Sequence, residues 1–154
     1  MVLKEDLGLQ KALARNYVFH GLPVSVIAAI AGLALQRKYK AEAIIVKRFG
    51  KDTDLFVLLE GTACIHAAHG DVIAEFGPGS VIGEISLIDE QPRSATVMAT
   101  SDVIAAVIPM DALRGVISMD PSIGLTMMSN IAHVLCRRLR HMNEHVDSIG
   151  LSQG

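Results

Sequence analysis

The segment spanning residues 76–97 restricts the fold of this 154-residue chain more than any other part of it. It opens with the turn sequence Gly-Pro-Gly at residues 77–79 and soon reaches a further glycine followed by an acidic residue, Gly83-Glu84. A short apolar stretch comes next, and residues 92–95 then lead into a β-like run. Glycine and proline are the strongest local breakers of regular structure. The segment is therefore predicted to be a compact loop with about one turn of helix, followed by a strand.

The same segment resembles the phosphate-binding cassette of the cyclic nucleotide-binding domain family. The resemblance lies in the Gly83-Glu84 pair, the triplet Arg-Ser-Ala at residues 93–95 and the spacing between them. It implies that the chain binds a cyclic nucleotide through Gly83, Glu84, Ile85, Ser86, Arg93, Ser94 and Ala95. In the family, the matching glutamate holds the ribose and the matching arginine holds the phosphate.

The chemistry of these residues suits such a ligand, which carries one singly charged phosphate and one free ribose hydroxyl. Arg93 offers a planar, permanently charged fork of donors to the phosphate. The N–H groups of a helix that starts after Gly83 favour an anion, and Ser94 and the N–H of Ala95 add further donors. Glu84 only accepts hydrogen bonds when ionised, so it suits the ribose hydroxyl.

Each of these residues also has a purely structural interpretation. Glu84 could be a favourable acidic residue in the first turn of a helix. Arg93 could pair with Asp89 or Glu90 on the surface, an interaction of about 0–1 kcal/mol. The complete pattern, with its glycines in place, favours a ligand site over these separate explanations.

Composition excludes several classes of protein. A hydrophobic content of 51% and a charged content of 19% exclude a disordered chain, and a net charge of −2 provides no basic surface for nucleic acid. The longest apolar stretch, residues 22–35, is too short to span a membrane. Cys64 and Cys136 are too few for a disulfide framework or a four-cysteine iron–sulphur cluster. No signal peptide is evident, so we expect a soluble cytoplasmic protein.

Short apolar runs between glycine-rich turns predict an α+β fold, a small eight-stranded β jelly-roll barrel flanked by helices. We expect one domain over residues 1–154. Its N-terminal helices occupy about residues 1–35 (helices at 7–18 and 24–35), its barrel residues 40–108, and its hinge and C-terminal helices residues 109–149. Within the barrel, strands are expected at residues 43–49, 55–59, 62–67, 72–76, 96–99 and 103–108.

Residues 121–149 are predicted to form one long helix that begins at Pro121 and ends at Gly150. Its apolar positions alternate in steps of three and four, the pattern of a two-stranded coiled coil: Leu125, Met128, Ala132, Leu135, Leu139, Met142, Val146 and Ile149. A second strip, Ile123, Met127, Ile131 and Val134, is expected to face the barrel. Two strips predict a parallel homodimer with its seam at Leu135, Leu139, Met142 and Val146. The alternative is a monomer that buries its wide apolar face in its own fold.

The family resemblance also places Arg138, Met142 and Asn143 where the base would lie. Asn143 could hydrogen-bond to adenine, whereas Met142 could not. Ser94 is compatible with either purine, and we favour cAMP over cGMP as the ligand. After the long helix, the sequence leaves no room for a DNA-binding domain. We therefore expect no nucleic-acid contact through this chain, which is either a stand-alone sensor or the sensor part of a longer protein.

Two rival functions follow from the same sequence. The first is a cupin-type metal enzyme, for which His66 and His69 are the nearest candidates, while His141 and His145 could share a metal on a helix. Neither pair makes a complete set, so we predict no metal site, no catalytic residue and no cofactor. The second rival is a dimerisation module with a decayed nucleotide site, but Glu84 and Arg93 are both present. We therefore expect a non-enzymatic cyclic nucleotide sensor whose effector the sequence does not identify.

Overall fold

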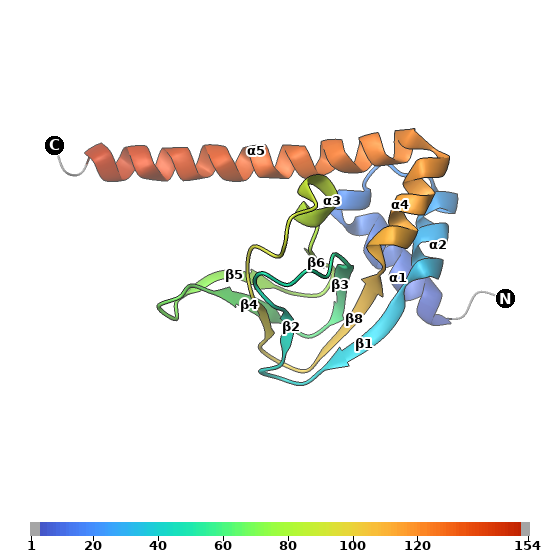
Figure 1. The fold of residues 1–154 in the computed structure, drawn as a ribbon, viewed down its shortest axis with the longest axis horizontal. Coiled ribbons are helices and arrows are strands. Elements are labelled where there is room, and N and C mark those ends of the chain that lie inside the picture. Colours follow the sequence, from blue (N-terminus) through green and yellow to red (C-terminus); the bar gives the residue numbers. More distant parts are fainter. Residues whose placement is uncertain (1–3, 152–154) are drawn as a thin grey trace.

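The computed structural model describes residues 4–151, so the first three and last three residues of the predicted domain lie outside the described residues. The helices are α1 (Lys4–Arg15), the 3-10 helix η1 (Tyr17–Phe19), α2 (Val24–Leu33), α3 (Ile85–Asp89), α4 (Met110–Met119) and α5 (Pro121–Leu151). The strands are β1 (Leu35–Tyr39), β2 (Ile44–Val46), β3 (Leu55–Glu60), β4 (Ala63–His66), β5 (Val72–Phe76), β6 (Val81–Ile82), β7 (Val97–Ala99) and β8 (Val103–Ile108). Figure 1 shows their arrangement.

The predicted α+β fold is confirmed, with eight strands in the described range and helices at both ends of the chain. The strands do not form one continuous barrel. They form two four-stranded antiparallel sheets, in the orders β1-β8-β3-β6 and β2-β7-β4-β5. The long irregular segment around α3 connects β6 of the first sheet to β7 of the second.

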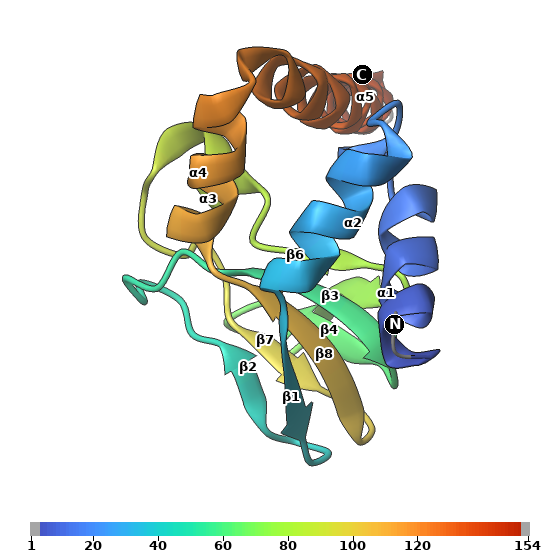
Figure 2. The ribbon, with the colours of Figure 1, turned by 90° about the vertical axis from the view of Figure 1, so that its right-hand side faces the viewer.

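Two hydrophobic cores hold these layers together, and β3 contributes to both. Its side chains alternate across the sheet, as in any strand. Leu55 and Val57 join the core that includes α1, α2, α4 and α5, whereas Phe56 and Leu58 join the core that contains residues of both sheets. Figure 2 shows the helices gathered on one side of the β1-β8-β3-β6 sheet. Because both sheets contribute to a shared core, the segment between β6 and β7 is held at each end by a packed strand.

The first half of the helix α5 packs against the rest of the protein, and its second half is exposed. Ile123, Met127 and Ile131 are buried in the helical core. From residue 136 to residue 150 every side chain is exposed, and Figure 1 shows this half extending beyond the helical layer. The helix has 31 residues and is thus about 46 Å long. These three residues face inward as expected, but α5 packs mainly against η1 and α4 rather than against the strands. Leu135, a predicted residue of the dimer seam, also packs against this core.

Several elements differ from the prediction, and four of these differences have a local reason. Residues 35–39 form β1 rather than the end of a helix and the start of a loop, and their mostly exposed side chains lack the usual apolar alternation. The strand β6 has only two residues, too few for a pattern. Strand β2 ends early, because Phe49 has a positive φ of 66° in the turn that follows. Gly150 does not stop α5, since one glycine costs a helix only about 1 kcal/mol.

Candidate functional site

The cassette conformation depends on glycines at two points. In the opening turn, the N–H of Ser80 donates to the carbonyl of Gly77, and Gly79 has a φ of 87°. Gly83 has a φ of 96°, a backbone conformation that favours glycine. A Cβ at residue 83 would overlap Nη1 of Arg93 and lie 3.0 Å from the carbonyl oxygen of Asp54. Gly83 therefore lets the backbone pass directly against the arginine.

Arg93 is the central polar residue of the site and is only 4% exposed. Its Nη2 donates to Oδ2 of Asp52 at 3.0 Å and to the carbonyl of Asp54, and its guanidinium carbon lies 5.8 Å from the ring centroid of Phe56. Among the described residues, Nε and Nη1 are buried without a hydrogen-bond partner. Buried donors are nearly always satisfied. Arg93 therefore presents two unpartnered donor nitrogens in a buried environment.

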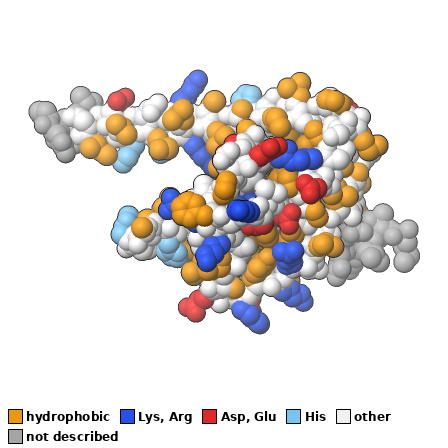
Figure 3. Space-filling model, in the orientation of Figure 1, with side chains coloured by type: hydrophobic (Ala, Val, Ile, Leu, Met, Phe, Trp, Pro, Cys, Tyr) orange, Lys and Arg blue, Asp and Glu red, His pale blue; other side chains and the backbone are white. Residues whose placement is uncertain are grey.

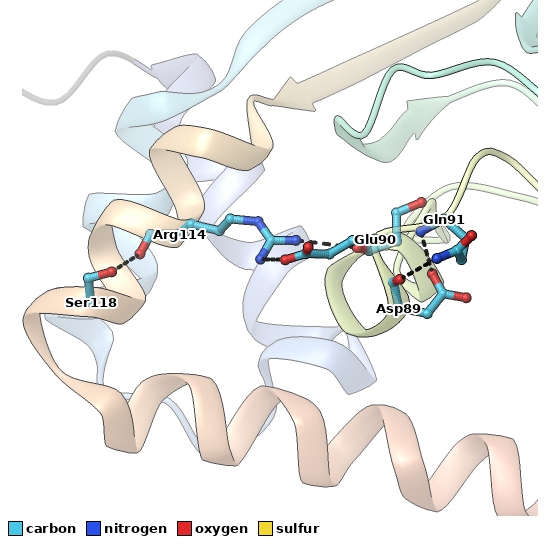
Figure 4. Close-up of polar contacts among 6 residues, drawn as sticks. Asp89, Glu90, Gln91, Arg114 and Ser118 are labelled. Atoms are coloured by element: carbon cyan, nitrogen blue, oxygen red, sulfur yellow. Dashed lines mark hydrogen bonds and ion pairs between the residues drawn. The ribbon is translucent and has the colours of Figure 1, made fainter.

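The predicted alternative, a surface pair between Arg93 and Asp89 or Glu90, is wrong. Figure 4 shows both acidic residues engaged elsewhere. The carboxylate of Asp89 accepts from the N–H of Gln91 at 3.0 Å, and Glu90 pairs with Arg114 of α4 at 2.7 Å. Glu90 has a positive φ of 55° at the end of α3. Asp89 therefore accepts from the neighbouring Gln91 and Glu90 pairs with α4, while Arg93 is buried.

Glu84 is also buried, with 8% of its surface exposed, and it lies at the N-cap position of α3. Its Oε1 accepts a hydrogen bond from the hydroxyl of Tyr17 at 3.1 Å and lies 3.9 Å from Nη1 of Arg138. Burial of the phenol, together with the Glu84 charge and hydrogen bond, raises the pKa of Tyr17 well above its usual range. Glu84 thus joins the N-terminal region, the cassette and α5.

A large open cleft brings the cassette, the sheets and α5 together. Figure 3 shows it as the hollow beneath the projecting half of α5. All seven predicted cassette residues line it, as do Tyr17, Arg138, His141 and Met142. The three α5 residues share one helix face, because positions i, i+3 and i+4 are neighbours. Asn143, a predicted base contact, lies on another part of the helix and does not line the cleft.

The remaining cassette residues differ in their surroundings. Ser94 is exposed and Ala95 is half-buried, so the donors expected from both lie at the cleft surface. Ile85 is 37% exposed, whereas Ser86 is buried and its carbonyl accepts from Arg114 at 3.4 Å. Ser86 therefore connects the cassette to α4 through its backbone.

The histidines of the rival interpretation have other neighbours. His69 pairs with Asp71 at 3.0 Å in the turn after β4, and a ring nitrogen of His66 lies 3.5 Å from Sγ of Cys64. In the described part of the chain, no group of three or more His, Cys, Asp or Glu side chains could hold a metal ion. Over the same residues, no helix has the length and apolar character that crossing a bilayer requires.

The arrangement can bind a polar ligand. Two unpartnered nitrogens of the Arg93 guanidinium and an acceptor carboxylate on Glu84 line one cleft, which matches a ligand that carries both an anionic group and a hydroxyl. Three further members of this site, Tyr17, Asp52 and His141, are not predicted by the sequence. They lie in η1, in the loop before β3 and in α5, all outside the cassette sequence.

Comparisons with known proteins agree with this geometry. A family model described as "Cyclic nucleotide-binding domain" matches residues 36–120. A CRP-like cAMP-activated global transcriptional regulator of Mycobacterium tuberculosis is 26% identical over 142 residues, which cover 90% of this chain and 62% of the relative. Glutaminase 2 of Bradyrhizobium diazoefficiens is 33% identical over 126 residues, which cover 82% of this chain and 20% of the relative. The chain thus spans between one fifth and about three fifths of the length of these relatives.

Solved structures show the same fold. A cyclic nucleotide-binding domain from Methylobacillus flagellatus KT has a TM-score of 0.75 at 21% identity, covering 93% of this chain and 83% of that one. The catabolite activator protein of Thermus thermophilus has a TM-score of 0.71 at 25% identity, covering 88% of this chain and 63% of that one. The residues matched by the family model include the whole cassette with Glu84 and Arg93. This chain is a member of the cyclic nucleotide-binding domain family.

Proposed function

We propose that this chain is a sensor domain that binds cAMP through its phosphate-binding cassette and acts by binding rather than by catalysis. The observation that carries the proposal is the pair of buried, unpartnered nitrogens on Arg93. A phosphate bound beside this guanidinium would accept from donors that the described residues leave unused, and it would place an anion beside a permanent cation. Glu84, at the same cleft, would accept the ribose 2′-hydroxyl.

The preference for cAMP is supported by the relatives. They include the cAMP-activated regulator of Mycobacterium tuberculosis and cAMP-dependent protein kinase regulatory subunits of several organisms. In the cleft, Met142 offers an apolar surface for a base and His141 a polar group beside it. The match to glutaminase 2 covers one fifth of that protein, so we do not extend a glutaminase activity to this chain. We expect the sensor to work in the cytoplasm.

Signal transmission would pass from the cassette to the helices that contact it. Arg114 of α4 pairs with Glu90 and donates to the carbonyl of Ser86, so α4 is tied to α3 by polar contacts. Residues of α4 and α5 share one hydrophobic core. A ligand shifts such an equilibrium only as far as it binds one arrangement more tightly than the other. We propose that ordering of the cassette by the phosphate biases α4 and, through it, α5.

The exposed half of α5 would serve as the dimer seam. Leu139, Met142 and Val146 are 58%, 63% and 65% exposed, and they follow the coiled-coil spacing. Covering this apolar stripe with its counterpart from a second copy would remove it from water. Because Met142 also lines the cleft, a partner helix would lie close to the bound base.

Isothermal titration calorimetry tests the binding proposal. Wild-type protein should bind cAMP, bind cGMP more weakly, and not bind 5′-AMP, which lacks the cyclic phosphate. Arg93→Met should lose about 2–5 kcal/mol of binding free energy, because the phosphate would be buried without its charge partner. Arg37→Met is the matched control, since it removes an exposed arginine from β1 and should bind like wild type. A wild-type chain that binds none of these nucleotides at millimolar concentration would instead support a dimerisation module.

Sedimentation equilibrium tests the dimer. Leu139→Glu places a charge in the seam and should convert a dimer of wild-type protein to a monomer. Arg140→Glu changes an exposed neighbouring residue outside the stripe and should leave the dimer intact. A monomeric wild type with and without cAMP would contradict this assignment of α5.

A further inference from the structure

Tyr17 reaches the candidate ribose site from a part of the chain outside the family match, which begins at residue 36. Its hydroxyl donates to Oε1 of Glu84 at 3.1 Å, across 67 residues of sequence. The ion-pair contact of Arg138 falls on the same oxygen, at 3.9 Å. In the described part of the chain, both side-chain contacts of this carboxylate therefore converge on Oε1.

The phenol is held by a firmly anchored backbone. Asn16 caps η1, because its Oδ1 accepts from the N–H of Val18 at 2.9 Å, while its Nδ2 donates to the carbonyl of Gly79 at 2.7 Å. From α5, Nδ2 of Asn130 donates to the carbonyls of Val18 and His20 at 3.1 and 2.8 Å. The element that carries Tyr17 is thus bonded both to the turn that opens the cassette and to α5. Such support fixes a side chain before a ligand arrives.

The two carboxylate oxygens consequently have different tasks. An ionised carboxylate has about four lone-pair sites on its two oxygens, so one oxygen can serve the protein while the other serves a ligand. We infer that Tyr17 is a positioning residue, which holds Oε1 of Glu84 so that Oε2 faces the cleft and accepts the 2′-hydroxyl of a cyclic ribonucleotide. This inference rests on the proposed function. It adds an explanation of how the site would distinguish a cyclic ribonucleotide from its 2′-deoxy analogue.

The chemistry of Tyr17 suits this task. The phenol remains protonated well beyond neutral pH, because burial and the neighbouring carboxylate both raise its pKa. It therefore acts as a constant donor and leaves the charge of Glu84 in place. Replacement by phenylalanine keeps the ring and removes only the hydroxyl. The carboxylate would then lose its fixed orientation. The 2′-hydroxyl of the ligand would therefore contribute less to the binding affinity.

The test compares cAMP with 2′-deoxy-cAMP by calorimetry. In wild-type protein the deoxy compound should bind about 10- to 100-fold more weakly, as expected for loss of a hydrogen bond to a charged acceptor. Tyr17→Phe should reduce this ratio at least about fivefold, mainly by weakening cAMP. Tyr39→Phe is the matched control, because it deletes the hydroxyl of a half-buried tyrosine in β1, which packs against the core between the sheets. It should leave the ratio unchanged.

A second variant separates positioning from folding. Glu84→Gln keeps the shape of the side chain but removes its charge and should itself lower the ratio. Adding Tyr17→Phe to Glu84→Gln should then change the ratio less than about twofold, since Tyr17 acts through Glu84. Because both nucleotides are measured on one preparation, a general loss of folded protein leaves the ratio unaffected.

The outcomes are distinguishable. No binding of cAMP would overturn the proposed function. Normal binding of cAMP with a wild-type ratio near one would overturn the ribose role of Glu84, and the role of Tyr17 with it, but would leave the proposed function in place. A normal wild-type ratio that Tyr17→Phe leaves intact would overturn only the role of Tyr17. Tighter binding of cAMP by Tyr17→Phe would also overturn it, because Tyr17 would then be a competitor for the carboxylate.

Discussion

Replacement of Arg93 by methionine should strongly weaken nucleotide binding and yet leave the ligand-free protein about as stable as wild type. Arg93 is almost fully buried, and two of its nitrogens lack partners among the described residues. A buried arginine that only stabilises the fold is expected to have hydrogen-bond partners for all its nitrogens. A ligand-binding arginine can lack such partners in the ligand-free protein, at a cost in stability.

The magnitude follows from the contacts of Arg93. Each unsatisfied buried donor costs about 1–3 kcal/mol, so removal of Nε and Nη1 should return about 2–6 kcal/mol. The substitution also removes two hydrogen bonds, one to Asp54 and one to the half-exposed carboxylate of Asp52, together worth about 2–4.5 kcal/mol. The contact with Phe56 is largely kept, because a thioether also packs well on an aromatic ring. The difference between these two ranges runs from about −2.5 to about +4 kcal/mol, with its middle near +1 kcal/mol.

Urea unfolding at 25 °C, followed by circular dichroism without nucleotide, measures this difference. Arg37→Met is again the control and should change the free energy of unfolding by less than about 0.5 kcal/mol, as for most exposed positions. An Arg93→Met variant destabilised by more than about 2.5 kcal/mol, the lower end of that range, would refute the reasoning. It would show that Arg93 holds the cassette together, and that its unpartnered nitrogens are not a sign of ligand binding.

Three further predictions concern the surroundings of Arg93. Gly83→Ala should cost about 1–3 kcal/mol of stability, because of its positive φ and the overlap with the arginine, whereas Gly77→Ala has open space and should lower the thermal midpoint much less. Arg114→Ala should cost less than about 1 kcal/mol in urea unfolding, since Arg114 and Glu90 are both partly exposed; a larger loss would mean that this pair, rather than apolar packing, holds α4. Tyr17 has a raised pKa in the folded state, so its contribution to stability is complete below pH 10 and is lost as the pH rises further. Tyr17→Phe should therefore flatten the alkaline decline of the urea midpoint between about pH 10 and 12, and an unchanged decline would contradict the pKa shift.

The sequence by itself determined the features that depend on neighbouring residues. The turns at residues 77–83 depend on the local backbone freedom of their glycines rather than on distant contacts. The cassette can therefore be recognised from the order of its residues alone. The inward-facing strip of α5 can also be predicted from the sequence, because a helix repeats every 3.6 residues and Ile123, Met127 and Ile131 follow that repeat. Prediction fails where a local pattern is weak, as in β1, whose exposed side chains carry no alternation.

Only the tertiary structure decided which distant groups meet in the cleft. Arg93 pairs with Asp52 across 41 residues and Glu84 with Tyr17 across 67, although acidic residues much closer to Arg93 in sequence were available. Asp89 and Glu90 do not pair with it, because the chain turns Arg93 into the protein while the end of α3 faces α4. Sequence periodicity reports which face of an element is apolar, but the partners of a buried polar group depend on how the sheets and helices pack. The residues able to hold a phosphate can therefore be named from the sequence, whereas those that orient them cannot.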